Sequence, residues 1–502
     1  MKMNRRDFVR IAGAAIGGSL VPGELFGLGS KPRKRPNVVL VMTDDQGWGQ
    51  TGYYNHPVLK TPNLDSMADN GLRFDRFYAG APLCSPTRAT VLTGRSNNRS
   101  NVISHGYAMR LQEKTIAQAL KKAGYNTAHF GKWHLNGYRG LGVPILESDS
   151  HHPGVFGFDT WLSVTNYFDI NPLMGRNGKF EEFKGDSSEV IVDEALKFIE
   201  QNQKSKDQKP FFAVVWFGSP HGPWIAHAKD MEPFAKLDQK SKKHYAELVA
   251  VDRSIGTLRA GLKKLGLSDN TIVWFNSDNG GLKKIKPETV GGLRGYKSQV
   301  YEGGLRVPCV IEWPAGIKPR ITNYPASTLD IAPTLVDLLG LPKDSLLDLV
   351  DGDSIAPLFK KEIGSRKKYI PFRQYNKAAL IDNNYKIVQP NINKDKYKLY
   401  DLEKDPTESK DLFSEKPEVA ARLKKALDDF NASLVQSDTG ADYPEGKLTV
   451  ADKGRTDWEK APGYQPYLNQ LKQYIRPKHR KQKKTQNTKS KKGTSKGSKK
   501  NK

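Results

Sequence analysis

The sequence predicts an α/β fold with a mainly parallel central sheet and helices on both faces, followed by a small C-terminal domain of antiparallel sheet and helix. Two observations predict it. From residue 36 to about 365, short apolar runs of strand length alternate with segments of helical periodicity, which is typical of strand–helix–strand units. From about residue 366, strands follow one another with only turn residues between them.

The first part begins with "NVVLVMT" (37–43), a continuous apolar run that predicts a buried strand. A helix follows in "TPNLDSMADNG", where Thr61 can cap the start, Pro62 takes the first helical position and Gly71 lies past the end. The same alternation continues through helix 115–124, the strand and exit loop "YNTAHFGKWH", helix 187–202, strand 211–217, a helix over about 240–265, strand 271–276, strand "VPCVIEW" and helix "STLDIAPTLVDLLG". We expect one large domain over residues 36–365.

The second part has a different pattern. "KAALIDNNYKIVQ" and "KYKLYDLEKDPTESKDL" predict short antiparallel strands with turns. "KPEVAARLKKALDDFNASLVQ" has apolar residues at helical spacing and predicts one amphipathic helix. We therefore expect a small α+β domain over residues 366–475.

The N-terminus, residues 1–30, resembles a bacterial twin-arginine export signal. Arg5 and Arg6 precede a weakly apolar stretch that is rich in Ala and Gly. This stretch is too short and too rich in Gly for a good membrane span, but an N-terminal membrane anchor is the alternative. The expected location is periplasmic or at the cell envelope, and the export machinery is an expected partner.

The C-terminal tail, residues 476–502, carries thirteen Lys and Arg and no acid, so it supplies half of the formal charge of +26. It has no apolar periodicity, and we expect it to be disordered. Its charge suits binding to polyanions, and a solubilising role is the alternative. No aromatic residues are interleaved with the charges, so the tail does not indicate a nucleic-acid enzyme.

Polar residues that can take part in catalysis or metal binding follow four of the predicted strands. The exits carry Asp44-Asp45, then Gly131-Lys132-Trp133-His134, then Gly218-Ser219-Pro220-His221, and then Ser277-Asp278-Asn279-Gly280. In an open parallel sheet, ligands bind beyond the carboxyl ends of the strands. A single such exit is usually only a turn, but four together predict a functional site at one edge of the sheet.

The acids and the amide among these residues predict a metal site. Asp44, Asp45, Asp278 and Asn279 all offer oxygen, which suits a hard divalent cation. Ca²⁺ is the expected cation and Mg²⁺ the alternative, and no Cys/His cluster has zinc spacing. Adjacent side chains in an extended segment point to opposite sides, so Asp44 and Asp45 can both ligate only if the chain turns at these residues, and the following Gln46-Gly47 favours a turn.

The chain has only two cysteines, which excludes a disulfide framework. Cys309 lies in an apolar run where a buried thiol fits. Cys84 lies among turn and cap residues, directly before a helix that we expect Ser85 to cap and Pro86 to begin. The start of a helix attracts anions, so the residue types alone suggest a thiolate nucleophile. A thiolate beside a hard, oxygen-binding metal is a poor match.

Positive side chains complete an anion site around Cys84. Arg88 lies one turn into the same helix, and Lys132 and Lys297 add charge if they converge there. Together with the metal, they predict a pocket for a tetrahedral anion.

The segment "CSPTRATVLTGR" resembles the signature of the type I sulfatases, Cys-x-Pro-x-Arg followed by Thr-Gly-Arg. The resemblance spans about 36–415 and includes "PNVVLVMTDDQGWG", "TPNLDSMADNGLRFDRFY", "GYNTAHFGKWHLN", "SPHGPW", "FNSDNGG", "LRGYKSQVYEGGLRVPCVIEWP" and "LYDLEKDPTESKDL". It implies an alkaline-phosphatase-like fold and a maturation enzyme that oxidises Cys84 to Cα-formylglycine. The metal partner at position 84 is then an oxygen of the hydrated aldehyde.

The resemblance also implies the mechanism of ester cleavage. Water adds to the aldehyde at position 84, and the metal and Arg88 favour ionisation of one hydroxyl of the hydrate. This oxygen attacks sulfur in line, the substrate alcohol leaves, and a covalent sulfate ester stays on residue 84. His221 and Lys297 are the expected proton donors to the leaving oxygen.

The second half-reaction regenerates the aldehyde. His134, oriented with Lys132, takes the proton of the second hydroxyl, the C–O bond breaks and sulfate leaves. A serine or a thiol has no second hydroxyl and cannot release sulfate in this way.

Two rival functions share these features. A phosphodiesterase or phosphonate monoester hydrolase could use the same elements, but one metal faced by Lys132 and Lys297 suits a monoanionic sulfate ester better. A catalytically dead binder of sulfated polysaccharide would need a damaged site, and none of the expected residues is missing. We expect a sulfated carbohydrate substrate, contacted by loops within 136–186. The candidate contacts there are Trp161, Tyr167, Arg176 and, with surface histidines as the alternative, His151 and His152.

Overall fold

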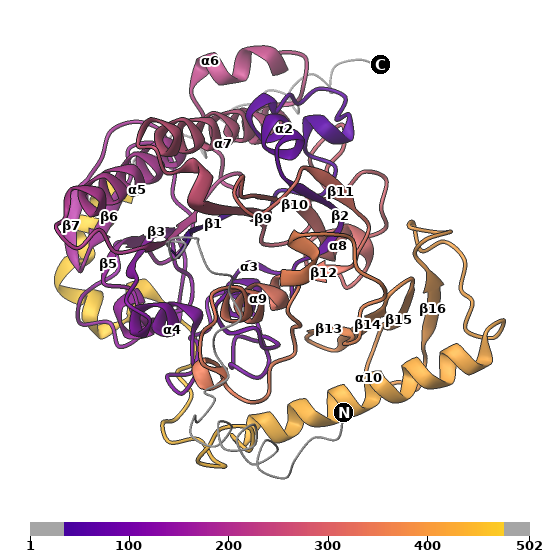
Figure 1. Cartoon of the computed structure of the whole chain (residues 1–502). Coiled ribbons are helices and arrows are strands. Elements are labelled where there is room, and N and C mark those ends of the chain that lie inside the picture. Colours follow the sequence, from indigo (N-terminus) through magenta and orange to yellow (C-terminus); the bar gives the residue numbers. More distant parts are fainter. Residues whose placement is uncertain (1–34, 476–502) are drawn as a thin grey trace, which may run out of the picture. The chain divides into compact units, whose positions relative to one another are not determined.

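The computed structural model describes residues 35–475 (Figure 1). The predicted export signal (1–30) and basic tail (476–502) lie outside these residues. Within 35–475, none of the helices combines the length and the apolar character needed to cross a membrane.

The larger part is built on one sheet in the order β11-β2-β10-β9-β1-β8-β3-β5-β6-β7, with β12 beside β2. Its central strands β9, β1, β8, β3 and β5 run parallel, as the sequence predicts. The strands are β1 (Asn37–Thr43), β2 (Leu72–Tyr78), β3 (Asn126–Lys132), β5 (Thr160–Val164), β6 (Leu173–Arg176), β7 (Lys179–Glu182), β8 (Phe211–Trp216), β9 (Thr271–Ser277), β10 (Arg306–Glu312), β11 (Arg320–Thr322) and β12 (Ala326–Ser327).

Helices cover both faces of this sheet because its central strands are apolar on both sides. In β1, Val38, Leu40 and Met42 pack into one apolar cluster, whereas Val39 and Val41 pack into another. The first cluster takes in α3 (Cys84–Thr93), α4 (Ile116–Lys122) and α9 (Ile331–Leu338). The second takes in α2 (Pro62–Asp69), α5 (Ser187–Lys204) and α7 (Gln239–Lys264). Figure 1 shows the two groups on opposite sides of the sheet. The short helices α6 (Ala228–Met231) and α8 (Glu302–Leu305) lie in loops.

The C-terminal part contains the predicted antiparallel sheet and helix. Its sheet has the order β13-β14-β15-β16, and α10 packs on one face. The elements are β13 (Ile370–Gln374), β14 (Lys377–Asp382), β15 (Tyr385–Gln389), β16 (Lys398–Asp401) and α10 (Pro417–Asp438). The other face of the sheet joins an apolar cluster with Tyr78, Leu305 and Leu329 of the larger part. The two parts therefore share buried surface.

Three features differ from the sequence-based expectation. β10, which contains Cys309, runs antiparallel to both of its neighbours rather than continuing the parallel pattern. Helix α3 begins at Cys84 and not at Pro86. The chain after α10 returns to the larger part, where β17 (Thr456–Asp457) pairs with β4 (Tyr138–Arg139).

Candidate active site

The four predicted exits meet at one edge of the sheet, because β9, β1, β8 and β3 are parallel neighbours. The backbone fastens these exits to one another. The Asp44 N–H donates to the Ser219 carbonyl at 3.1 Å, and the Asp278 N–H donates to the Thr43 carbonyl at 3.1 Å. The polar ends of the strands are thus linked to one another by backbone hydrogen bonds and are not separate turns.

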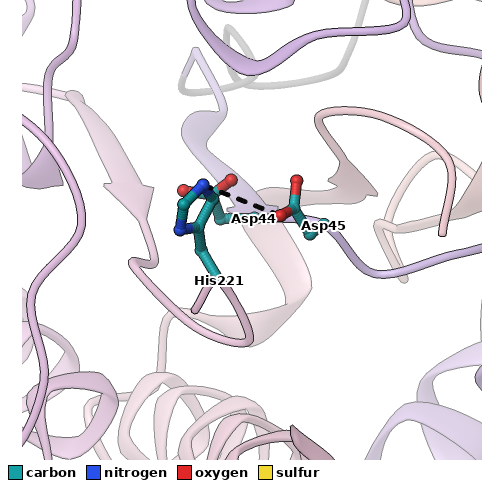
Figure 2. A group of neighbouring side chains, drawn as sticks. All are labelled: Asp44, Asp45 and His221. Carbon is teal, nitrogen blue, oxygen red and sulfur yellow. Dashed lines mark ion pairs between the residues drawn. The ribbon is translucent and has the colours of Figure 1, made fainter. Parts of the chain in front are cut away.

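The chain turns at Asp45 itself, which adopts the left-handed conformation with φ of 73°. This turn lets the adjacent carboxylates of Asp44 and Asp45 face the same space. Figure 2 shows both carboxylates beside the ring of His221, and each of the three side chains offers a ligand atom within 4.8 Å of the others. Asp44 also forms a second group of this kind with Cys84 and Asp278.

The residues fit a divalent cation. Asp44 Oδ1 and Asn279 Oδ1 are buried oxygens that have no hydrogen-bond partner in the described chain. The Asn279 amide is oriented by donating to Asp45 Oδ1 at 2.9 Å. Burial and the neighbouring charge of Asp44 raise the pKa of Asp278 well above its usual range. Unsatisfied oxygens among crowded, buried carboxylates indicate a site that a hard cation would neutralise.

Three cations surround the carboxylates. Lys132 pairs with Asp44, Lys297 pairs with Asp45, and Arg88 Nη2 lies 3.1 Å from Asp278 Oδ2. Burial lowers the pKa of Lys297, but Asp45, Cys84, Asp44 and Asp278 together outweigh burial and raise the pKa of this lysine above its ordinary value.

The Arg88 guanidinium is held in place from two sides. It lies over the ring of Trp216, 5.0 Å from the centroid, and its Nη1 donates to the Lys132 carbonyl at 2.9 Å. No sequence pattern singled out Trp216, because its role depends on the packing of α3 against the end of β8.

Cys84 occupies the first position of α3, whose first-turn N–H groups have no partners within the helix. Its Sγ lies 3.4 Å from His134 Nδ1. Ser85 does not cap the helix, contrary to the prediction; its Oγ accepts the Gly106 N–H at 2.8 Å. Burial raises the pKa of the Cys84 thiol, so the residue is a thiol at neutral pH. This disfavours the simple thiolate nucleophile.

His221 is oriented by two contacts. Its Nδ1 lies 2.6 Å from the Gly222 carbonyl, and because a carbonyl only accepts, Nδ1 carries the proton. The ring stacks on Tyr167 with a centroid distance of 5.0 Å and an interplanar angle of 14°. Its Nε2 therefore points toward the site, 3.7 Å from Asp45 Oδ2.

The structure buries two of the candidate substrate contacts and holds two others in contacts within the chain. Trp161 and His151 are 3% and 6% exposed and belong to the interior. Arg176 is held by Glu181 and Glu194. His152 instead caps a short 3₁₀ turn and stacks on Trp161. Of these candidates, only Tyr167 lies against a predicted catalytic residue.

The chain belongs to the sulfatase family. The family model "Sulfatase" matches residues 36–341, which is more than half of the chain. A second model, N-sulphoglucosamine sulphohydrolase, C-terminal, matches residues 295–433.

Known proteins agree with this assignment. The chain is 33% identical over 360 residues to an N-acetylgalactosamine-6-sulfatase of Canis lupus familiaris, covering 63% of this chain and 65% of the relative. It is 31% identical over 357 residues to an ulvan-active sulfatase of Formosa agariphila, covering 65% of each. The chain thus matches just under two thirds of the length of these relatives.

Solved structures show the fold. The crystal structure of Ps i-CgsB in complex with k-i-k-neocarrahexaose superposes with a TM-score of 0.70 at 24% identity, over 79% of this chain and 93% of that one. The prediction of an alkaline-phosphatase-like fold is confirmed.

Proposed function

We propose that the chain hydrolyses a sulfate ester of a carbohydrate to an alcohol and inorganic sulfate. The observation that carries the proposal is the position of Cys84. It begins α3 in contact with His134 and shares a group of possible ligand atoms with Asp44 and Asp278. The relatives support the substrate class, since one is an N-acetylgalactosamine-6-sulfatase and another an ulvan-active sulfatase.

Two groups would complete the site. Ca²⁺, with Mg²⁺ as the alternative, would be held by Asp44, Asp45, Asp278 and Asn279 and would stabilise negative charge on oxygen. Cα-formylglycine, made from Cys84 by an oxidising maturation enzyme, would supply a hydrated aldehyde as nucleophile.

The side chains of the protein itself would bind the sulfate and transfer the protons. Arg88, Lys132 and Lys297 neutralise the sulfate and the charge that develops during cleavage. Lys297 gives a proton to the leaving alcohol oxygen, and His221 does so in its doubly protonated form, because its Nδ1–H is already committed to the Gly222 carbonyl. His134, which contacts position 84, accepts the hydroxyl proton whose loss releases sulfate.

We further propose that a twin-arginine signal exports the chain to the periplasm or the cell envelope, with retention as an N-terminal anchor as the alternative. The basic tail would then bind polyanions outside the cytoplasm. Fusion of residues 1–30 to a reporter that is active only outside the cytoplasm tests the export. Arg5→Lys together with Arg6→Lys should abolish it, and unchanged export would contradict the proposal.

A comparison of aryl esters tests the proposed reaction. The matured protein should turn over 4-nitrophenyl sulfate with a higher kcat/KM than bis(4-nitrophenyl) phosphate or a phenyl phosphonate monoester. Faster turnover of either phosphorus ester would assign the site to the rival class. Binding of sulfated saccharide without any turnover, by protein shown to carry formylglycine, would indicate a binding protein.

Metal removal should abolish activity and lower stability. Chelation with EDTA removes the cation that neutralises the buried carboxylates, and added Ca²⁺ should restore both turnover and melting temperature. A ligand at 100 times its dissociation constant stabilises a protein by about 2.7 kcal/mol. Asp278→Asn keeps the shape of the side chain but removes a charge, so its Ca²⁺-dependent shift in Tm should shrink.

Asp429→Ala is the matched control, because Asp429 is an exposed acid that pairs with Lys425 on α10. This variant should show the same Ca²⁺-dependent shift in Tm as the wild type. An unchanged rate after exhaustive chelation, with no bound metal by elemental analysis, would show that the ligand assignment is wrong.

A further inference from the structure

A cation that pairs with no carboxylate of residues 35–475 contacts the loop of Ser104 and His105, which we call the rim. It is Arg455, which is half-buried in the segment that returns to the larger part after α10. Arg455 Nη1 donates to the His105 carbonyl at 3.1 Å and to Ser104 Oγ at 3.3 Å. The segment lies beyond both matching family models, which end at residues 341 and 433.

The loop that Arg455 contacts is fastened to the residue beside the nucleophile position. The Gly106 N–H donates to Ser85 Oγ at 2.8 Å. Gly106 has φ of 72°, and a Cβ there would lie 2.9 Å from the Tyr138 carbonyl, so the loop is wedged between α3 and β4. Because β4 pairs with β17, this arrangement places Arg455 close to the start of α3.

The charges that act on His105 include those of two lysines of the candidate active site. Burial lowers the pKa of His105, and the charges of Arg455, Lys297 and Lys132 lower it further. The ring therefore lies within electrostatic reach of both Arg455 and the lysines that we assign to the sulfate.

The lack of an acidic partner distinguishes Arg455 from nearby cations. Arg139 pairs with Asp457, Lys453 pairs with Asp149, and Arg110 pairs with Asp452. Within residues 35–475, Arg455 has no such ion pair. Its guanidinium instead lies over the ring of Tyr107, 5.1 Å from the centroid, which holds the group while leaving its charge uncompensated.

An exposed aromatic side chain lies at the same place. Tyr375, in the turn between β13 and β14, is 54% exposed, and its hydroxyl lies 2.6 Å from Ser104 Oγ. An uncompensated guanidinium beside an exposed ring suits a ligand that has both an anionic group and an apolar face.

We propose that Arg455, with His105 and Tyr375, binds a second anionic group of the substrate, on the sugar that carries the reacting sulfate or on its neighbour. This assignment rests on the proposed sulfatase function and makes the substrate a polyanionic saccharide. The second anion is a uronate carboxylate or a second sulfate, since the guanidinium fork recognises both.

The test compares three substrates: 4-nitrophenyl sulfate, a sulfated disaccharide that contains a uronate, and a disulfated disaccharide without a carboxylate. Arg455→Ala should lower kcat/KM for at least one disaccharide by about 10- to 100-fold more than for 4-nitrophenyl sulfate, because a hydrogen bond to a charged group is lost. The disaccharide that is affected identifies the second anion. For that disaccharide, the kcat/KM of Arg455→Lys should lie between the values of the wild type and of Arg455→Ala. High salt should reduce the difference in kcat/KM between the wild type and Arg455→Ala.

Lys447→Ala is the matched control, because it removes one charge from the same segment where the backbone contacts Gln112 rather than the rim. It should leave all three rates unchanged. Equal effects of Arg455→Ala on all substrates, or no effect, would overturn the assignment while leaving the sulfatase function intact. Absence of turnover of all three by matured wild type would contradict the proposed function, and with it this substrate class.

Discussion

Cys84→Ser is expected to lower kcat by roughly 10³-fold or more when the protein is produced with a maturation enzyme that accepts only cysteine. Serine at position 84 can be sulfated only once, because it has no second hydroxyl through which sulfate can be expelled. The measurement is turnover of 4-nitrophenyl sulfate, with the identity of residue 84 established by mass spectrometry.

The second cysteine provides the matched control. Cys309 is fully buried in β10 and belongs to the apolar core rather than the site. Cys309→Ala should therefore retain turnover, even if it unfolds at a lower temperature. Full activity from a variant shown to carry unmodified serine at position 84 would rule out the proposed nucleophile.

His134→Ala should release about one equivalent of alcohol per active site and then stall. Its Nδ1 contacts position 84, and burial lowers its pKa well below 6.5, so the ring is neutral and able to accept a proton. Without it, ester cleavage can proceed once, but release of sulfate lacks its base, which is typically worth about 10²–10⁴-fold. Rapid-mixing kinetics would show the burst, and intact mass would show sulfate retained on residue 84.

Two further variants make this test specific. His134 has φ of 58°, a conformation that asparagine tolerates better than alanine, so His134→Asn separates loss of the base from backbone strain. His221→Ala should instead slow the burst itself, and more for alkyl esters than for nitrophenyl esters. If His134→Ala traps no sulfate and His221→Ala shows no dependence on the leaving group, the two roles must be exchanged or abandoned.

The sheet and the convergence of its exits could be predicted because they follow from local patterns and one topological rule. "NVVLVMT" and "TIVWFN" are apolar enough to be strands buried on both faces, and parallel neighbours end at the same edge. Asp44 and Asp278 therefore had to lie close together. The turn needed at Asp44-Asp45 was also inferred, although the sequence did not show that Asp45 itself adopts the left-handed conformation.

Contacts between distant segments could not be predicted. The residue type of Ser85 predicts a helix cap, but its hydroxyl oxygen instead accepts a hydrogen bond from the Gly106 N–H. Trp161 and His151 lie in a region expected to form the mouth, yet packing places both in the interior. Arg455 reaches the rim only because a two-residue strand, β17, pairs with β4, and so short a strand has no periodicity to detect.

The most direct test of the central claim is the exact mass of the peptide that contains residue 84, from protein whose active fraction has been titrated. The account predicts formylglycine or its hydrate in a fraction that equals the active fraction, and unmodified cysteine in the inactive remainder. Fully active protein in which this peptide carries only cysteine would contradict it.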